Sequence, residues 1–446
     1  MKDTPKEMTP PTVPNAAGQG GEIRARWAWS EPSVWTERML TALENGVKGG
    51  VWFSLMDKVF APKNLLAAWK RVERNEGAAG VDGQRIEHFS KDCLSNLKKL
   101  HEELRDGSYR PKPVRRVWIP KPGSTQKRPL GIPTVRDRVV QGALRAVLEP
   151  IYEVRFSEHS YGFRPGRGCK DALRRVDQLL REGYTHVVDA DIQSYFDRID
   201  HDLLMEEVRK EVADGSVLDL LRVFLGQRVM DGLDSWTPDE GTPQGAVMSP
   251  LLANIFLHPV DLALRDAGYE MVRYADDLVI LCKSDAEAQD ALAMLAAQTT
   301  ARKLTLHPDK TRIVDTTQPG GFDFLGYHFE LGRKTPRKKS LQKLRDNVRA
   351  KTPRLSGESI EQTIAALNRT LRGWFEYFKH CARSVFRGVD EFTRRRLRAI
   401  LLRHQKQRGF GAGYANKRWP NAYFAERGLL SLAAAHAHAR QARKSP

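Results

Sequence analysis

The sequence is constrained most by two acidic segments, each of which stands at the end of a short apolar run. YADD at 274–277 lies between apolar runs that begin at Val272 and Leu278, and DIQSYFD at 191–197 follows the valine-rich run at 186–190. Short apolar runs bounded by turn residues are typical of buried strands. Taken alone, each acidic segment also fits an ordinary Asp-rich turn or a helix cap.

Considered together, the carboxylates predict a metal site. Like charges at one sheet edge raise each other's pKa values, and divalent cations relieve the repulsion. Two such ions, about 3.5–4 Å apart, hold the attacking and leaving oxygens of an in-line phosphoryl displacement. Ligands that are all oxygen favour Mg²⁺. Asp189 and Asp191 point to the same face of an ideal strand, so spacing leaves either as the partner of Asp276 and Asp277, and Asp191 lies nearer the strand end.

The distribution of charge indicates a polyanionic partner. The 446 residues include 73 Lys and Arg against 55 Asp and Glu, a formal net charge of +18. Residues 333–446 hold 28 basic and 7 acidic side chains, and residues 110–145 hold 10 and 1, so the remainder is mildly acidic. Two basic blocks around an acidic body are typical of a protein that binds nucleic acid.

Other classes of protein are disfavoured by composition. No apolar run approaches the roughly 20 residues that span a bilayer. The first 30 residues lack the apolar core of a secretory signal. The four cysteines are far apart and form no C-x-x-C pair, which argues against a structural zinc site and a disulfide framework. We therefore expect no membrane partner and a reduced, cytoplasmic location.

Periodicity predicts an α+β chain whose C-terminal part is nearly all helical. Helices are expected over 31–58, 64–74, 93–104, 134–152, 249–267 (kinked at Pro259), 359–378 and 390–404. Strands are expected at 186–192, 272–274, 278–281, 310–314 and 322–329, with a basic hairpin over 115–133. Trp374 and Phe378 lie on the apolar stripe of the helix at 359–378, so we expect them in a core. The less periodic segment from Tyr414 to Phe424 is a candidate to stack on bases.

Longer motifs carry a family resemblance. YADD, DIQSYFD and TPQGAVMSPLLANIF at 242–256 resemble the catalytic motifs of reverse transcriptases. The wider match is to the reverse transcriptase–maturases encoded by group II introns, and it covers roughly residues 60–430. Its other segments are GVDG at 80–83, RVWIPKPGSTQKRPLGIPTVRDRVVQ at 116–141, SYGFRPGRGCKDAL at 160–173, LTLHPDKTRIV at 304–314, FDFLGYHF at 322–329 and LNRTLRGWFEYF at 367–378.

The resemblance implies a right-hand polymerase with fingers, palm and thumb. It divides the chain into an N-terminal arm and helix (1–58), fingers (59–185), palm (186–332), an α-helical thumb or maturase X domain (333–410) and a basic nucleic-acid-binding tail (411–446). That tail lacks the paired cysteines of an H-N-H endonuclease. In this respect the chain resembles the group IIC-like lineage.

Residue roles are carried over where the motifs match. Asp191, Asp276 and Asp277 match the catalytic triad that holds two Mg²⁺ ions. Phe196 matches the aromatic residue that screens the sugar 2′ position. The remaining nucleotide-binding candidates are Gln244, Gly245, Lys121, Arg128 and Lys310. The nucleic-acid-binding candidates come from the basic blocks and are Arg115, Arg116, Arg136, Arg138, Arg394, Arg395, Arg396, Lys417 and Arg418.

The function implied is that of an RNA-directed DNA polymerase of a mobile group II intron. Such a protein also binds its intron RNA, assists splicing as a maturase and takes part in retrohoming. Its partners would be the intron RNA, an RNA template with a DNA primer, target DNA and dNTPs. Two alternatives share the fold: a maturase that acts only in splicing, and a domesticated or defence-associated reverse transcriptase.

Overall fold

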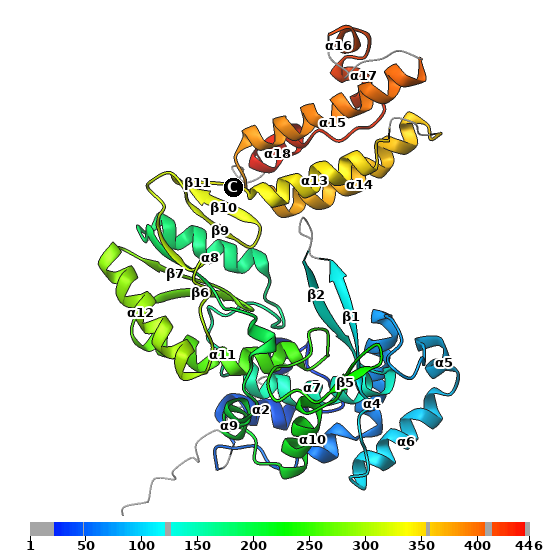
Figure 1. Cartoon of the computed structure of the whole chain (residues 1–446), viewed down its shortest axis with the longest axis vertical. Coiled ribbons are helices and arrows are strands. Elements are labelled where there is room, and N and C mark those ends of the chain that lie inside the picture. Colours follow the sequence, from blue (N-terminus) through cyan, green and yellow to red (C-terminus); the bar gives the residue numbers. More distant parts are fainter. Residues whose placement is uncertain (1–21, 48, 121–125, 354–356, 406–412, 442–446) are drawn as a thin grey trace, which may run out of the picture.

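The computed structural model describes residues 22–47, 49–120, 126–353, 357–405 and 413–441 (Figure 1). Its N-terminal third is mainly helical, with α4 packed on α7. The helices are α2 (Glu37–Asn45), α3 (Met56–Val59), α4 (Pro62–Asn75), α5 (Ile86–Lys91), α6 (Cys93–Arg105) and α7 (Val135–Glu153). The single helix expected over 31–58 is wrong. The chain between α2 and α3 contains Gly46, Gly49 and Gly50 with φ of 87°, 86° and 77°, values that an α-helix does not use.

The fingers contain a four-stranded sheet in the order β2-β1-β4-β5. The predicted basic hairpin is confirmed as β1 (Val114–Pro120) and β2 (Lys127–Ile132), which pair antiparallel. A second hairpin, β4 (Val229–Asp231) and β5 (Asp234–Trp236), joins this sheet because β4 pairs with β1 in parallel, although the expected division places its residues in the palm. The tip at 121–125, which includes Lys121, lies outside the described residues.

The palm contains a second four-stranded sheet in the order β6-β7-β3-β8. Its strands are β3 (His186–Asp191), β6 (Glu270–Tyr274), β7 (Asp277–Cys282) and β8 (Arg312–Asp315). Val187 faces one hydrophobic core and Val188 the other, so both faces of the sheet are buried. Burial on both faces explains why these strands are continuous apolar runs without strict alternation.

Helices cover both faces of the palm sheet (Figure 1). The helix α8 (Cys169–Arg181) contacts β6 and β7. On the other face, α12 (Asp285–Ala301) contacts β3 and β7, and α11 (Ser249–Asp266) contacts β6. The helix α11 continues through Pro259 to Asp266. The palm is completed by η1 (Tyr195–Asp197), α9 (His201–Arg209) and α10 (Gly215–Leu225).

A small third sheet leads into the helical C-terminal part. It has the order β11-β10-β9, with β9 (Phe322–Phe324), β10 (Tyr327–Glu330) and β11 (Arg333–Pro336). The continuous strand expected at 322–329 is wrong, because Leu325 and Gly326 adopt φ of 46° and 85° and turn the chain between β9 and β10. The helices are α13 (Lys338–Ala350), α14 (Ile360–Phe378), α15 (Arg383–His404), α16 (Tyr414–Arg418), α17 (Asn421–Glu426) and α18 (Leu432–Gln441).

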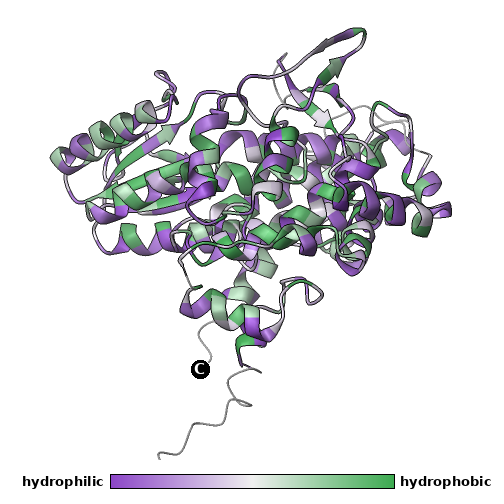
Figure 2. Ribbon diagram, turned by 90° about the horizontal axis from the view of Figure 1, so that it is seen from below, coloured by the Kyte–Doolittle hydropathy of each residue, from purple (hydrophilic) through white to green (hydrophobic). Residues whose placement is uncertain are grey.

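The helix predicted over 359–378 is confirmed as α14. Ser359 and Gln362 form a reciprocal capping box at the start of α14. In Figure 2, individual helices carry both hydrophobic and hydrophilic residues, as expected for amphipathic helices. Within the described part of the chain, no helix combines the length and the apolar character needed to cross a bilayer.

Candidate active site

The acidic segments meet at one edge of the palm sheet. β6 and β7 form a hairpin in which Tyr274 pairs with Asp277, so Ala275 and Asp276 are its two turn residues. On the other side of β7, Asp191 at the end of β3 pairs directly with Asp277. Side chains of directly opposed residues have Cβ atoms about 4.5–5.5 Å apart. The antiparallel register therefore places Asp191 beside Asp277, next to Asp276 of the turn.

The electrostatics of this edge leave negative charge uncompensated. The side chain of Asp277 is exposed at the strand end, yet desolvation by the surrounding protein, followed by the neighbouring carboxylates of Asp276 and Asp191, raises its pKa to about 6. Burial also raises the pKa of Asp276. The ammonium of Lys310 lies 2.5 Å from Oδ2 of Asp191 and is the one cation paired with these three carboxylates among the described ion pairs. Neighbouring carboxylates with raised pKa values repel one another when ionised, and divalent cations such as Mg²⁺ relieve this repulsion.

The geometry of the described side chains differs from that of an assembled metal site. No group of three or more His, Cys, Asp and Glu residues in the described segments is arranged to hold a metal ion. Asp189, the alternative to Asp191, lies 3.5 Å from the guanidinium of Arg312, and burial raises its pKa to about 6. Because Asp189 pairs with Val279 and not with Asp277, it lies farther along the strands from the turn.

The loop at 242–248 connects the palm edge to the fingers. The Gly131 N–H on β2 donates to the carbonyl of Gln244 at 2.7 Å. Gly245 has φ of +107°, and a Cβ there would approach the carbonyl oxygen of Gly131 to 2.8 Å, so the close contact requires glycine. Phe196 is half-buried, and its carbonyl accepts from the Thr242 N–H at 2.8 Å. Arg128 is exposed on the adjoining strand β2.

A pocket of about 250 Å³ opens between this loop and the fingers sheet. Arg116, Gln244 and Asp197 contribute to its lining. The guanidinium of Arg116 lies over the ring of Trp236 at 4.7 Å, which turns it toward the β4–β5 hairpin. Two predicted candidates, Arg116 and Gln244, thus line one pocket although 128 positions of chain separate them.

Three of the arginines predicted to bind nucleic acid are instead engaged inside the fingers. Arg115 donates to the carbonyl of Ala79 through two nitrogens, at 3.1 and 2.6 Å. Arg138 is buried and donates to the carbonyls of Pro133 and Ala78. Arg136 pairs with Glu103 and lies over the ring of Tyr109 at 5.2 Å. Nucleic-acid binding by these three residues stays a prediction, and their guanidinium groups already bond to protein groups.

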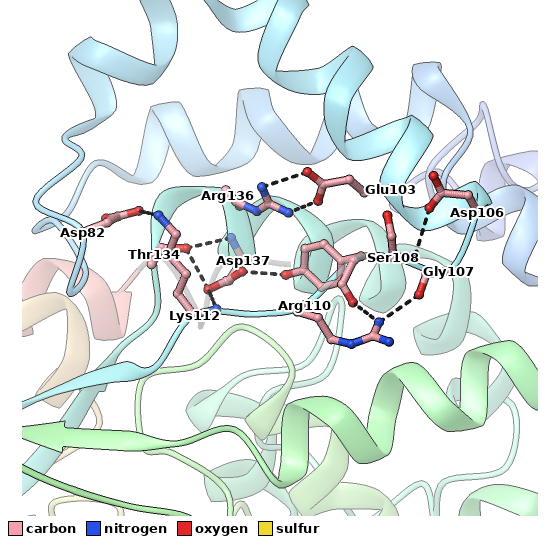
Figure 3. A network of polar contacts seen from close by, with 11 residues as sticks. Asp82, Glu103, Asp106, Gly107, Ser108, Arg110, Lys112, Thr134, Arg136 and Asp137 are labelled. Carbon is pink, nitrogen blue, oxygen red and sulfur yellow. Dashed lines mark hydrogen bonds and ion pairs between the residues drawn. The ribbon is translucent and has the colours of Figure 1, made fainter.

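Figure 3 shows the polar network around Arg136. The carboxylate of Asp137 accepts hydrogen bonds from the hydroxyls of Tyr109 and Thr134, at 2.6 and 2.7 Å. It also accepts from the Lys112 N–H at 3.2 Å. These bonds fasten the chain leading into β1 to the first turn of α7, so the network supports the base of the fingers hairpin.

The nucleic-acid-binding candidates in the C-terminal part include both engaged and exposed side chains. Arg396 donates to the Thr352 hydroxyl at 3.0 Å and Arg394 lies 4.0 Å from Asp390, so both are partly engaged. Arg395, Lys417 and Arg418 are exposed.

Aromatic residues in this region are mostly part of the core. Phe378 is buried, as predicted, and Trp374 packs half-buried against the same core. Trp419 and Phe424 are buried as well, so within the candidate segment from Tyr414 to Phe424 these two rings belong to the core. Tyr414 remains exposed.

Sequence reasoning missed the buried groups that hold the turn between β6 and β7. Arg273 precedes the turn on β6 and is ion-paired with Asp261 of α11, and both are fully buried. Gly162 packs so closely on Ala275 that no side chain fits there. The available signal was a charged residue within an apolar run, in VRY at 272–274 and in PVDLAL at 259–264, because charged residues are rarely buried unless paired.

A palm sheet that ends in three carboxylates, joined by a short loop to a basic fingers hairpin and followed by a helical domain, defines a right-hand nucleic-acid polymerase. Residues 119–329 match the family "Reverse transcriptase (RNA-dependent DNA polymerase)", and residues 341–419 match "Group II intron, maturase-specific domain". The chain belongs to the group II intron-type reverse transcriptases, which carry both parts.

Similar curated proteins agree with this placement. Protein YkfC of Escherichia coli (strain K12) is 33% identical over 347 residues, 68% of this chain and 85% of YkfC. The group II intron-encoded protein LtrA of Lactococcus lactis is 37% identical over 213 residues, 47% of this chain and 35% of LtrA. The putative COX1/OXI3 intron 1 protein of Saccharomyces cerevisiae is 33% identical over 203 residues, 45% of this chain and 24% of that protein. The chain thus matches most of YkfC but about a third or less of the two intron-encoded proteins.

Proposed function

We propose that the chain synthesises DNA on an RNA template at the palm edge, with Asp191, Asp276 and Asp277 as the ligands of two Mg²⁺ ions. The observation that carries the proposal is the strand register that pairs Asp191 with Asp277 beside the turn at Asp276. In the reaction, the 3′-hydroxyl of a primer attacks the α-phosphate of a dNTP, and pyrophosphate leaves. When bound, the metal ions neutralise the developing charge and hold the attacking and leaving oxygens.

The surrounding residues have separate roles in this proposal. Gln244 and Gly245 pack against the templating pair and the incoming nucleotide, and Phe196 screens the sugar 2′ position. Arg128 and Lys121 contact the triphosphate. Lys310 pairs with Asp191 at 2.5 Å in this structure and would be released toward the phosphates when cations occupy the carboxylates.

The C-terminal part would bind group II intron RNA and assist its splicing and retrohoming from a cytoplasmic pool of protein. A pocket of about 730 Å³ between α13, α15 and α17, called the thumb pocket below, supports this role. Arg345, Arg349, Arg394, Arg395 and Arg398 line the pocket around Phe392. Clustered guanidinium groups match the phosphates of folded RNA.

Primer extension on an RNA template tests the polymerase proposal. The double variant Asp276→Ala/Asp277→Ala should abolish cDNA synthesis, because it removes two of the three proposed metal ligands. It should still bind RNA, because the arginines that line the thumb pocket are unchanged, and RNA binding therefore serves as the control for folding. Full cDNA synthesis by the double variant would refute the assignment.

A further inference from the structure

Arg273 is a buried cation two positions before Ala275, the first residue of the β6–β7 turn. It ends the apolar part of β6, and its side chain is 1% exposed. Its Nε donates to Oδ1 of Asp261 at 2.7 Å, and a second nitrogen donates to Oδ2, so the two groups form a bidentate pair. Asp261 is also fully buried, on α11.

The third nitrogen of Arg273 contacts the turn itself. It donates to the carbonyl of Ala275 at 2.9 Å and to Oδ1 of Asn254 at 3.0 Å. Ala275 has φ of 60°, a left-handed conformation that is unfavourable for a residue with a Cβ. Two-residue hairpin turns with a positive φ at the first position normally use glycine there. The hydrogen bond from Arg273 therefore holds a strained peptide in place.

A second element locks the turn from the outside. Residues 159–162 run along the free edge of β6, where the Arg273 N–H donates to the His159 carbonyl at 3.0 Å and the Tyr161 N–H donates to the Arg273 carbonyl at 2.9 Å. The amide of Asn254 donates to the Gly162 carbonyl at 2.8 Å. Arg273 and Asn254 thus connect α11, the 159–162 segment and the turn through consecutive hydrogen bonds.

An ion pair that served only packing would not need this arrangement. A buried pair can often be replaced by apolar side chains without loss of stability, because the desolvation of two charges offsets their attraction. An apolar replacement could not bond to the Ala275 carbonyl. We propose that Arg273 is a positioning residue for polymerisation, whose guanidinium fixes the strained turn so that Asp276 and Asp277 face Asp191.

The proposal rests on the catalytic role of the turn proposed above, and its test is steady-state primer extension by purified full-length protein. Arg273→Lys keeps the charge but cannot bond at once to Asp261 and Ala275. We expect kcat to fall at least tenfold and the Mg²⁺ concentration for half-maximal rate to rise, with KM for the dNTP little changed. Arg302→Lys is the matched control, because Arg302 is a mostly buried arginine whose ion pair is with Glu207 at 2.9 Å and not with the turn.

Rescue separates positioning from general stability. Glycine adopts the conformation of Ala275 without strain. Ala275→Gly in the Arg273→Lys background should therefore restore part of kcat and lower the Mg²⁺ requirement. If Arg273→Lys does not fold, Asn254→Ser, which removes the amide that orients the same nitrogen, should show the same kinetic signature more weakly.

Three results would overturn the proposal: unchanged kcat and Mg²⁺ dependence in the folded variants, a loss equal to that of Arg302→Lys, or no rescue by Ala275→Gly. Failure of the polymerase assignment is distinguishable, because it would appear as cDNA synthesis by Asp276→Ala/Asp277→Ala.

Discussion

Replacing Gly162 with alanine should disable polymerisation without unfolding the protein. The added Cβ would lie 2.9 Å from the carbonyl carbon of Tyr274 and 3.0 Å from Cα of Ala275, and closer still to the Ala275 amide nitrogen. All three are backbone atoms of the catalytic turn, so no flexible side chain can yield. The contact is relieved only if the turn or the 159–162 segment shifts.

The expected magnitude follows from the size of that shift. Ordinary contacts of a Cβ begin at 3.4 Å, so the turn must retreat by about 1 Å, a displacement that typically costs about 100-fold in rate. Overpacking of this kind costs about 1–3 kcal/mol. That is a fraction of the roughly 5–15 kcal/mol that stabilises a folded domain. We therefore expect a folded protein with about 1% of the wild-type kcat.

Single-turnover primer extension at saturating dNTP, together with a thermal melt, measures both quantities. Gly215→Ala is the control, because a Cβ at that position in α10 meets no atom within 4 Å. It should retain wild-type activity and melting temperature. A Gly162→Ala protein that extends primers at the wild-type rate would refute the argument that the 159–162 segment sets the position of the turn.

Three further predictions concern the protonation of Asp277, the selection of dNTP over rNTP, and RNA binding. The pKa of Asp277 is raised to about 6, so its charged form is lost as pH falls through this value. Primer extension at limiting Mg²⁺ should therefore drop between pH 7 and 5. The midpoint of this drop should move to lower pH at saturating Mg²⁺, because cations compete with protons, and an unshifted midpoint would contradict this. Phe196→Ala should raise rNTP incorporation relative to dNTP by about 10- to 200-fold in a competition assay, whereas unchanged selectivity would remove the proposed role. Arg138→Ala should lower stability by about 1–3 kcal/mol in a denaturant titration. The slope of log affinity for intron RNA against log salt should stay the same in that variant, whereas the exposed Arg395→Ala should reduce it by about 0.7–0.9 without changing stability.

The sequence predicted those elements that local patterns determine. The strands at 186–191 and 277–282 are apolar because both sheet faces are buried, so their runs were visible without the fold. The helix at 135–153 begins where Thr134 caps it. The β4–β5 hairpin was missed because its strands have three residues each and their place in the sheet depends on a parallel pairing with β1, more than 100 positions away.

The candidate site was predictable only in part for a related reason. The three carboxylates lie in recognisable motifs, and the strand register that brings them together follows from the hairpin. The pairing of Arg273 with Asp261 joins a strand to a helix, and only the packed palm reveals it. Gly162 likewise shows its purpose only when the Ala275 backbone is seen beside it.

Charge counts are a weaker guide to binding than they first appear, because a guanidinium that already bonds to protein groups has fewer donors left for phosphates. The block at 110–145 has nine more basic than acidic side chains, yet Arg115, Arg136 and Arg138 are engaged with the carbonyls of 78–79 and 133 and with Glu103. We therefore predict that nucleic-acid binding by this block depends mainly on its exposed basic side chains. In the C-terminal part, Arg345, Arg349 and Arg395 converge around Phe392 at an open pocket. Phosphate binding should accordingly depend more on this thumb pocket than the two charge counts alone would indicate.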